Sequence, residues 1–244
     1  MKISIIIPVY NEAATIEEIL KRVIDVDLDH DKEIFVVDDG STDDTKLLLA
    51  SLPAQIKVLR HTKNLGKGTA IRTALEQITG DIVIIQDADL EYNPSDYPAL
   101  IAPIFEGKTD VVYGSRWLEN RHPPIPVNRF IIGGRFITWL ANTLYGAGIT
   151  DEATCYKVFR ASLIKNLDLR CKGFEFCPEI TAKVILSGYN IYEVPISYNP
   201  RKAEEGKKLR VYDGLIAVAT LFRCRFQPAL SKKIEDANDR SSVI

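Results

Sequence analysis

Short apolar runs alternate with helical patterns along the first half of the chain. The three clearest runs are Ile3–Ile7, Ile34–Val37 and Ile82–Ile85, and polar residues follow each of them. Between these runs, apolar residues recur at helical spacing from Ile16 to Ile24 and from Ile71 to Ile78. The alternation predicts an α/β fold with a mixed, mostly parallel sheet. Because the runs are continuous rather than alternating, we expect helices on both faces and polar groups gathered at the strand ends.

The second half of the chain departs from this pattern. A proline-rich loop at 122–126 precedes a long apolar stretch, Phe130–Ile149. The further elements expected are a strand near Lys157–Phe159, a helix near Pro178–Ser187, a strand at Ile191–Val194 and a helix near Val211–Phe222. We expect one domain over residues 1–230 and a flexible tail over 231–244, which is polar and has no periodicity.

Two of the expected helices carry further signals. Thr15 and Glu18 have the spacing of a capping box at the start of the first helix. The stretch Phe130–Ile149 is about long enough to cross a bilayer, but Arg135 within it is costly in lipid. The stretch is amphipathic, with Ile132, Phe136, Leu140 and Leu144 on one face and Arg135, Thr138 and Asn142 on another. With Trp139 available at an interface, this favours contact with a membrane surface, and a core-facing helix is the alternative.

The composition excludes several classes of protein. Thirty-one Lys and Arg against 33 Asp and Glu give a formal net charge of -2, so no basic field favours nucleic acid as a partner. The four cysteines lack the paired spacing of zinc or redox sites, which indicates reduced cytosolic thiols. The first residues do not have the pattern of an export signal. We therefore expect a cytoplasmic protein.

Acidic residues stand where three of the expected strands end. Glu12 follows the first strand, Asp38-Asp39 the second, and Asp87, Asp89 and Glu91 follow the strand at 82–85. Two carboxylates separated by one residue can share Mg²⁺ or Mn²⁺ through oxygen ligands. An isolated pair of this spacing is more often a loop of solvated acids, but the two other acidic strand ends favour a metal site here.

Five short motifs occur in an order that resembles family 2 glycosyltransferases of GT-A fold. They are Ile6–Glu12, Val36–Asp43, Asn64–Gly68, Asp87–Leu90 and Gly114–Arg116. Within that family, residues 3–222 look most like the dolichyl- and polyprenyl-phosphate sugar transferases, the dolichol-phosphate mannose synthase group. Five motifs in order are far more specific than any one alone. The resemblance implies a GT-A (Rossmann-like) sheet flanked by helices, with C-terminal helices on the acceptor side.

The resemblance also implies a nucleotide-sugar donor and a bound cation, Mg²⁺ or Mn²⁺. The implied donor-binding residues are Pro8, Tyr10, Glu12, Asp39, Lys67, Asp87 and Ala88. The implied metal ligands are Asp87, Asp89 and Glu91, of which Asp89 is also catalytic and Glu91 replaces the glutamine common in the group. Lys67 is implied near the donor phosphates or the nucleobase, with simple helix entry as the alternative. A P-loop is excluded because His61 and Gly68 occupy its Gly and Ser/Thr positions.

Basic residues in the second half are implied to bind the acceptor. The implied acceptor and phosphate-binding residues are Ser115, Arg116, Arg129, Arg201 and Lys207, of which Arg116 is also catalytic. Positively charged forks suit phosphate oxygens. Two positions depart from the group's pattern, because Gly133 replaces a serine and the loop at 200–209 keeps a glycine and basic residues but lacks its serine.

These features predict an inverting transferase that moves a sugar from a GDP- or UDP-sugar to a polyprenyl phosphate at the cytoplasmic face of a membrane. A phosphate acceptor is largely dianionic near neutral pH, so it needs no protein base. One alternative is a hydroxyl acceptor, which requires a base, and Asp151 and Glu152 are the nearest candidates. We expect these two acids to order the acceptor-side loop instead. A non-catalytic subunit that binds a nucleotide-sugar is the other alternative, and the Asp87 and Asp89 pair argues against it.

Overall fold

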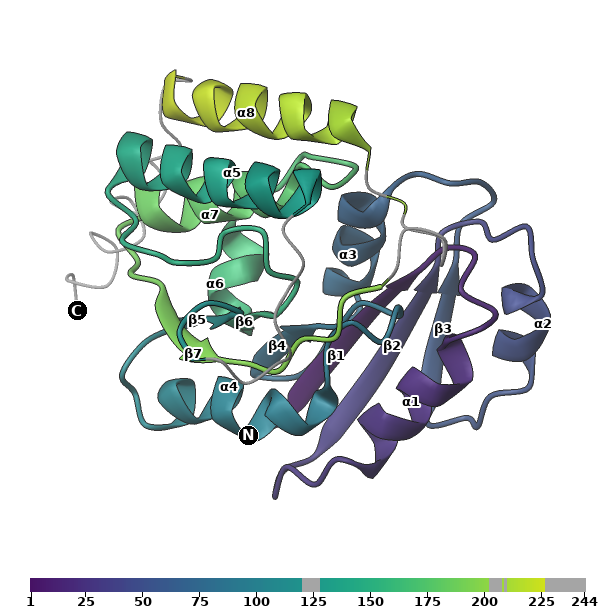
Figure 1. Ribbon diagram of the computed structural model, residues 1–244. Helices are drawn as coiled ribbons and strands as arrows, with labels where there is room; N and C mark the ends of the chain where they lie inside the picture. The colour runs from purple at the N-terminus through teal and green to yellow at the C-terminus, as the bar shows by residue number, and fades with distance from the viewer. Residues whose placement is uncertain (120–127, 202–207, 209, 227–244) are drawn as a thin grey trace, which may run out of the picture.

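Seven strands form one sheet in the order β3-β2-β1-β4-β6-β5-β7 (Figure 1). The computed structural model describes residues 1–119, 128–201, 208 and 210–226. The strands are β1 (Ile3–Val9), β2 (Lys32–Asp38), β3 (Ile56–Arg60), β4 (Ile82–Ile85), β5 (Val111–Ser115), β6 (Lys157–Arg160) and β7 (Tyr192–Pro195). β6 pairs antiparallel with β4 and β5, and every other pairing is parallel. The predicted mixed, mostly parallel α/β sheet is confirmed.

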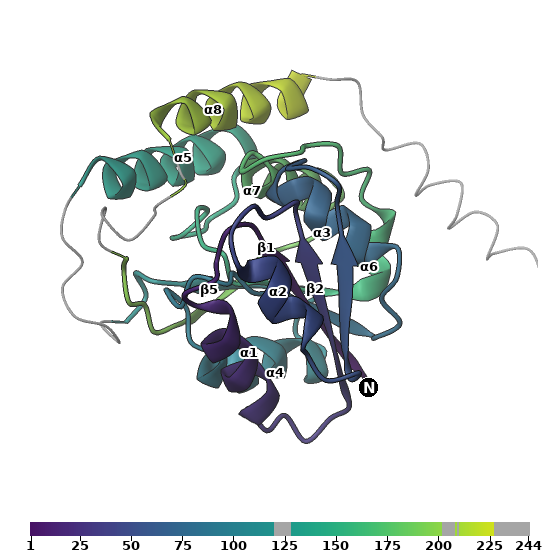
Figure 2. The same ribbon diagram turned by 90° about the vertical axis from the view of Figure 1, so that its right-hand side faces the viewer.

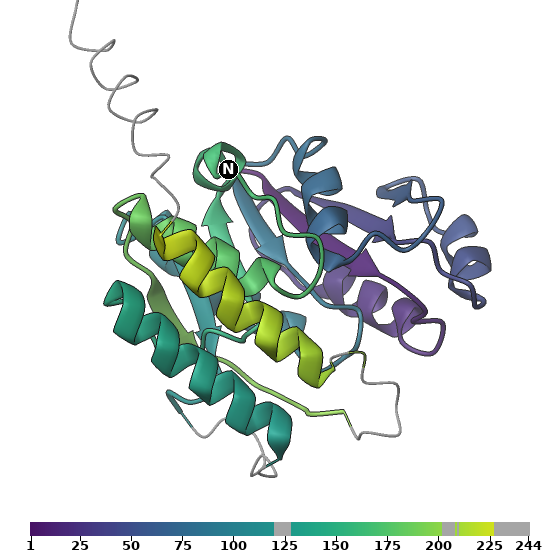
Figure 3. The same ribbon diagram turned by 90° about the horizontal axis from the view of Figure 1, so that it is seen from above.

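Helices cover both faces of the sheet, as the continuous apolar strands predicted. In chain order they are α1 (Ile16–Asp25), α2 (Thr45–Ala50), α3 (Lys67–Leu75), the 3-10 turn η1 (Pro94–Asp96), α4 (Tyr97–Phe105), α5 (Arg129–Tyr145), α6 (Ala161–Asn166), α7 (Phe176–Leu186) and α8 (Val211–Phe226). α1 and α4 lie on one face, and α3, α6 and α7 lie on the other (Figures 1 and 2). α5 and α8 form an outer layer over α7, side by side in Figure 3.

The first helix buries the face that its spacing predicted. Ile16, Ile19, Leu20 and Val23 of α1 are buried. The expected capping box is wrong, because no side-chain hydrogen bond caps this helix. The Thr15 hydroxyl donates instead to the Glu12 carboxylate at 2.9 Å, and Glu18 accepts from Arg22 one turn further along at 2.7 Å. Both capping side chains are therefore engaged elsewhere.

α5 is amphipathic, but its apolar faces are not the ones expected. Leu140 is buried with Ile137 and Ala141 against residues of α7 and α8. Thr138, expected on a polar face, is also buried. Its hydroxyl is satisfied there, because it donates to the Gly134 carbonyl at 2.9 Å and accepts from the Glu152 amide at 3.0 Å. The large exposed apolar side chains of the helix are Ile132, Phe136 and Trp139. Packing on two neighbouring helices therefore sets the orientation of α5.

The strand directions bring the polar segments of the chain to one edge of the sheet. β1, β2, β4, β5 and β7 all point the same way, and β6 points the other way, so the chain enters β6 where it leaves the others. The segments after residues 9, 38, 85, 115 and 195 therefore meet the segment before residue 157. The proline-rich loop at 122–126 and the polar tail expected at 231–244 lie outside the described residues.

Candidate active site

Asp87 and Asp89 lie in a turn directly after β4, and we call residues 86–91 the carboxylate turn. The Asp87 carboxylate pairs with the Lys67 ammonium, which begins α3, at 2.5 Å. The Asp89 carboxylate accepts the backbone N–H of Glu91 at 3.1 Å. Leu90 has φ +60°, a left-handed conformation that is uncommon for a residue with a side chain. The turn is therefore closed tightly around its two aspartates.

Negative charge accumulates in this turn. Burial, the Asp87 carboxylate and the Glu91 carboxylate together raise the pKa of Asp89 to about 7, against the opposing effect of Arg201. Burial disfavours the charged form of Lys67, but the adjacent Asp87 carboxylate outweighs this and raises the Lys67 pKa. A raised carboxyl pKa means that burial and neighbouring negative charge disfavour the ionised form. A cation bound between Asp87 and Asp89 would offset both effects.

Glu91, the third predicted metal ligand, accepts hydrogen bonds from the segment after β7, and its role as a ligand stays a prediction. The Glu91 carboxylate accepts the Tyr198 hydroxyl and the backbone N–H of Arg201, each at 2.9 Å. Across the described residues, no group of three His, Cys, Asp or Glu side chains is arranged to hold a metal ion. Asp87 and Asp89 still fit Mg²⁺ or Mn²⁺, since such ions commonly take one or two protein carboxylates and complete their shell with substrate phosphates and water.

Glu12 joins the end of β1 to the segment after β7. Its carboxylate pairs with Arg201 at 2.5 Å and with Lys208 at 2.8 Å. Lys208 also donates to the backbone carbonyls of Tyr10 and Asn11, and Arg201 donates to the Asp89 carbonyl at 2.9 Å. An arginine assigned to the acceptor thus contacts residues assigned to the donor and the metal. Lys207, the neighbouring candidate, lies outside the described residues.

The buried carboxylate of Asp39, directly after β2, contacts several groups of the following segment. It accepts the backbone N–H groups of Leu65 and Gly66 at 2.8 and 2.7 Å, and it lies 2.7 Å from Nδ1 of His61. The other ring nitrogen of His61 lies 2.9 Å from the Thr73 hydroxyl. Asp39 therefore orders the turn that leads to Lys67. The sequence did not predict this contact of His61. The residue drew notice there only because it occupies the glycine position that a P-loop requires.

The two glycines around Lys67 permit a close backbone approach. A side chain at Gly66, which has φ +96°, would meet the Lys172 carbonyl oxygen at 2.4 Å, and one at Gly68 would meet the Cys171 carbonyl oxygen at 2.5 Å. The start of α3 thus packs directly on the segment before α7. This close packing accounts for glycine at both positions where α3 begins. The same backbone path places the Lys67 ammonium beside the Asp87 carboxylate.

Arg116 is held by a carboxylate of the acceptor-side loop. Its Nε and Nη2 groups donate to the two oxygens of Asp151, each at 2.7 Å, and its backbone N–H donates to the same side chain at 3.1 Å. Its guanidinium carbon lies 5.0 Å from the centroid of the Tyr198 ring. Neighbouring Ser115 is fully buried, and its hydroxyl lies 2.6 Å from the Thr150 hydroxyl. Both predicted acceptor residues therefore order the loop at 150–152.

The remaining candidates surround this edge at different depths. Pro8 and Tyr10 are partly exposed at the end of β1, and Ala88 is buried between the two aspartates. Arg129 is exposed in the first turn of α5, with its guanidinium 5.0 Å from the Phe130 ring. The N-terminal ends of α5 and α8 lie on the side toward which β1 points (Figure 3).

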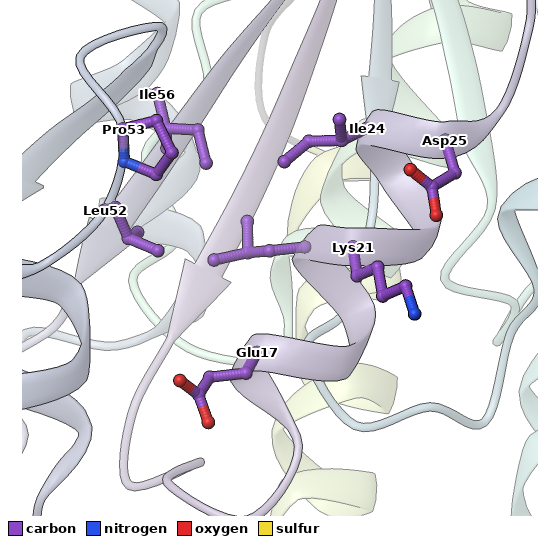
Figure 4. Close-up of a pocket in the computed structure, with 8 residues that line it drawn as sticks. Glu17, Lys21, Ile24, Asp25, Leu52, Pro53 and Ile56 are labelled. Carbon is purple, nitrogen blue, oxygen red and sulfur yellow. The ribbon is translucent and has the colours of Figure 1, made fainter.

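A shallow apolar hollow lies elsewhere, between α1 and the segment joining α2 to β3 (Figure 4). Leu20, Ile24, Leu52 and Ile56 line it, with charged side chains of α1 at its rim. None of its eight lining residues is a predicted site residue. The carboxyl edge of the sheet therefore remains the candidate site.

Comparison with known proteins agrees with the resemblance. The family model described as Glycosyl transferase family 2 matches residues 4–167. A dolichol-phosphate mannosyltransferase of Pyrococcus furiosus is 31% identical over 211 residues, which are 85% of this chain and 59% of that protein. A UDP-N-acetylglucosamine–dolichyl-phosphate N-acetylglucosaminyltransferase of Methanococcus voltae is 31% identical over 218 residues, 80% of this chain and 84% of that protein. The chain thus spans less than two thirds of the Pyrococcus relative.

Solved structures share the fold. Glucosyl-3-phosphoglycerate synthase from Mycobacterium tuberculosis, crystallised with Mn²⁺, uridine diphosphate and phosphoglyceric acid, superposes with a TM-score of 0.72 at 22% identity. The match covers 94% of this chain and 80% of that one. The expected GT-A fold is confirmed. None of the helices in the described part of the chain combines the length and the apolar character that a bilayer-spanning helix needs.

Proposed function

Because the chain belongs to glycosyl transferase family 2, we propose that it transfers a sugar from a GDP- or UDP-sugar to a polyprenyl or dolichyl phosphate, with inversion at the anomeric carbon. The observation that carries this proposal is the position of the carboxylate turn between the nucleotide-side strand ends and the arginine-bearing segments. The relatives support the acceptor class, because they are sugar transferases named for dolichyl or polyprenyl phosphates, and they include a dodecaprenyl-phosphate galacturonate synthase of Rhizobium johnstonii.

The donor is proposed to lie along the ends of β1, β2 and β4. Pro8 and Tyr10 border it at the end of β1, and Asp39 orders the turn before Lys67. Lys67 supplies a fixed positive charge at the N-terminus of α3, where backbone N–H groups also favour phosphate oxygens. Asp87 and Asp89 would hold Mg²⁺ or Mn²⁺, which when bound neutralises the charge that develops on the departing diphosphate.

The surroundings of Asp151 and Glu152 support a phosphate acceptor over a hydroxyl. A hydroxyl nucleophile needs a general base within hydrogen-bonding reach. Both oxygens of Asp151 accept from Arg116, and the Glu152 side chain is buried against the Thr181 hydroxyl. Burial raises the pKa of Glu152. A phosphate monoester already carries its nucleophilic oxygen, so in the proposed reaction these two acids order the loop and no protein base is needed.

A lipid acceptor requires a route to a membrane, and the outer helices offer an apolar surface. Ile132, Phe136 and Trp139 of α5 are exposed, as are Tyr212 and Leu215 of α8. Trp and Tyr side chains are enriched where proteins meet the bilayer interface. We propose that this side of α5 and α8 contacts the cytoplasmic face of a membrane, which makes the protein a peripheral one.

The test compares two acceptors that differ only in the reacting group. The purified chain is given each GDP- or UDP-sugar with Mn²⁺ and either a short-chain polyprenyl phosphate or the matching polyprenol. We expect transfer to the phosphate alone, with the anomeric configuration of the product inverted by NMR. Efficient transfer to the polyprenol would contradict the proposed acceptor, and no transfer from any donor would favour the non-catalytic alternative. A bound donor at one hundred times its Kd should also stabilise the fold by about 2.7 kcal/mol.

A further inference from the structure

Gln86 is the first residue of the carboxylate turn, and its side chain is fully buried. Its side-chain oxygen accepts the hydroxyl of Tyr97 at 2.6 Å and that of Tyr156 at 2.8 Å. Its side-chain nitrogen donates to the backbone carbonyl of Asp87 at 2.8 Å. Tyr97 begins α4 and Tyr156 directly precedes β6, so three separate segments meet at one amide.

The hydrogen bonds determine which way this amide points. A phenol hydroxyl reaches the amide oxygen from each tyrosine, and the two lone pairs of that oxygen are thereby used. The nitrogen is left facing the Asp87 carbonyl, which only a donor can satisfy. An unmet polar group at this depth would cost its desolvation free energy. The alternative amide orientation would place the Gln86 side-chain oxygen against the Asp87 carbonyl oxygen, two acceptors with no hydrogen between them, so the observed orientation is the favoured one.

The bond from Gln86 to Asp87 fixes the peptide plane between Asp87 and Ala88. The side chain of Asp87 is attached at the start of this peptide, and Asp89 follows Ala88 at its end. Ala88 is buried, and Leu90 beyond it is held in a left-handed conformation. We propose that Gln86, held by Tyr97 and Tyr156, is a positioning residue that keeps the carboxylates of Asp87 and Asp89 at the separation a divalent cation requires. This inference rests on the metal use in the proposed function.

The same group joins the carboxylate turn to the acceptor-side loop. The Tyr156 carbonyl accepts the Gly114 N–H at 2.8 Å, and the adjacent Cys155 N–H donates to the Tyr92 hydroxyl at 3.1 Å. The Tyr92 and Tyr156 rings lie 5.0 Å apart. The Gln86 amide is therefore one of the contacts between the carboxylate turn and the segment that leads from the acceptor-side loop into β6. Residues that orient metal ligands through hydrogen bonds commonly change metal affinity or activity 10- to 100-fold when they are altered.

The test is Gln86→Met, which keeps a similar length and removes both the donor and the acceptor. We expect Mn²⁺ alone, titrated by electron paramagnetic resonance without donor or acceptor, to bind at least about tenfold more weakly. We expect kcat to fall by a similar factor, with the acceptor KM unchanged. Tyr97→Phe and Tyr156→Phe keep the ring packing and should each give a smaller loss of the same kind. They keep the proposal testable if Gln86→Met does not fold.

Tyr113→Phe is the matched control. The Tyr113 hydroxyl is equally buried and lies 2.9 Å from the Thr181 hydroxyl, away from the carboxylate turn. We expect this variant to lower Tm like the other phenylalanine variants while binding Mn²⁺ as the wild type does. A purely structural role for Gln86 would move Tm alone in all of them.

A double variant separates coupling from general damage. Adding Tyr97→Phe to Gln86→Met should not weaken Mn²⁺ binding further, because the tyrosine acts through the amide. Wild-type Mn²⁺ affinity and kcat in folded Gln86→Met would overturn the positioning role while leaving the proposed function intact. A wild-type chain that transfers sugar without taking up Mn²⁺ or Mg²⁺ would overturn the metal site, and this inference with it.

Discussion

The side chains of Arg116 and Asp151 form a buried, two-pronged ion pair, with both N–O distances at 2.7 Å. Asp151 is 1% exposed and Arg116 is 8% exposed. The pair joins the end of β5 to the loop before β6. A substitution at either residue therefore changes the stability of the fold as well as any contact with an acceptor.

The first prediction concerns this pair. Arg116→Ala should lower the free energy of unfolding by about 3 to 5 kcal/mol, because it leaves the Asp151 carboxylate buried without its partner. The double variant Arg116→Met with Asp151→Leu should recover most of that loss, since no uncompensated charge remains. Urea unfolding of the single and double variants measures both values. Equal stability of the wild type and Arg116→Ala would mean that the pair contributes nothing to the fold.

The second prediction isolates the acceptor contact at an exposed arginine. Arg129→Ala should reduce kcat/KM for a polyprenyl phosphate by an amount equivalent to about 1.5 to 3 kcal/mol, the range for a lost charge-assisted hydrogen bond. Its Tm should not change, because the side chain is exposed. Arg135→Ala, on the same helix, is the matched control and should keep wild-type kcat/KM. An unaffected Arg129→Ala would remove this residue from the acceptor site.

The third prediction concerns the metal. Asp89→Asn should abolish transfer, because it removes a ligand charge while preserving volume, and chelation of the wild type should do the same. The raised pKa of Asp89 adds a stability test. Since burial and the neighbouring carboxylates disfavour the ionised form in the folded chain, the fold loses stability as the pH rises from the ordinary value of 3.8 to about 7, and the full cost is present above that. In EDTA at pH 8, the Tm of Asp89→Asn should therefore equal or exceed that of the wild type. Undiminished turnover by Asp89→Asn would show that the cation is assigned wrongly.

The fourth prediction concerns the membrane. Phe136→Gln with Trp139→Gln should weaken co-sedimentation with liposomes without lowering Tm, because both side chains project from α5 into solvent. Leu47→Gln on α2, where the leucine is 70% exposed, is the matched control and should sediment as the wild type does. Leu140→Gln should instead destabilise the fold, since Leu140 is buried. Full sedimentation of the Phe136 and Trp139 double variant would reject α5 as the contact surface.

The fifth prediction is a pH dependence that originates far from the active site. The buried Glu33 carboxylate accepts the Ser4 hydroxyl, the Thr79 amide and the Lys2 ammonium. Burial opposes ionisation, but these donors outweigh it and hold the pKa of Glu33 well below its ordinary value of 4.5. A depressed folded-state pKa stabilises the fold at pH values above the ordinary one and loses that contribution as the pH falls below it.

Replacing this carboxylate tests the dependence. The stability difference between the wild type and Glu33→Gln should be largest at neutral pH and should shrink as the pH is lowered below 4.5. Urea unfolding at about pH 7, 4 and 3, which lie on either side of the ordinary carboxyl pKa, measures this difference in unfolding free energy. A difference that does not change with pH would mean that ionised Glu33 is not stabilised by its donors.

Local patterns in the chain predicted the sheet because its strands are buried on both sides. The continuous apolar residues of β1 and β4 follow from helices lying over both faces. Because β1 and β4 are parallel, Glu12 and Asp87 could be placed at the same edge of the sheet before any contact was known. The partners themselves were beyond reach. Arg201 meets Glu12 across 189 residues of chain, and nothing in either neighbourhood specifies that contact.

The orientation of α5 was not predictable for a related reason. The helix has one apolar row at Ile132 and Phe136 and another at Ile137 and Ala141, and helical spacing alone ranks them equally. The choice is made by α7 and α8, which bury the second row. Gln86 escaped attention similarly, because a glutamine beside two aspartates gives no signal of the tyrosines that meet it from α4 and the start of β6.

The reversed direction of β6 has a consequence for how such a chain can diversify. A strand running against its neighbours delivers its preceding segment, rather than its following one, to the working edge of the sheet. The residues between β5 and β6 can therefore change in length or sequence without altering the order of β1, β2 and β4, whose ends carry the proposed donor residues. The segment proposed to bind the acceptor can thus vary while the strand ends proposed to bind the donor keep their arrangement.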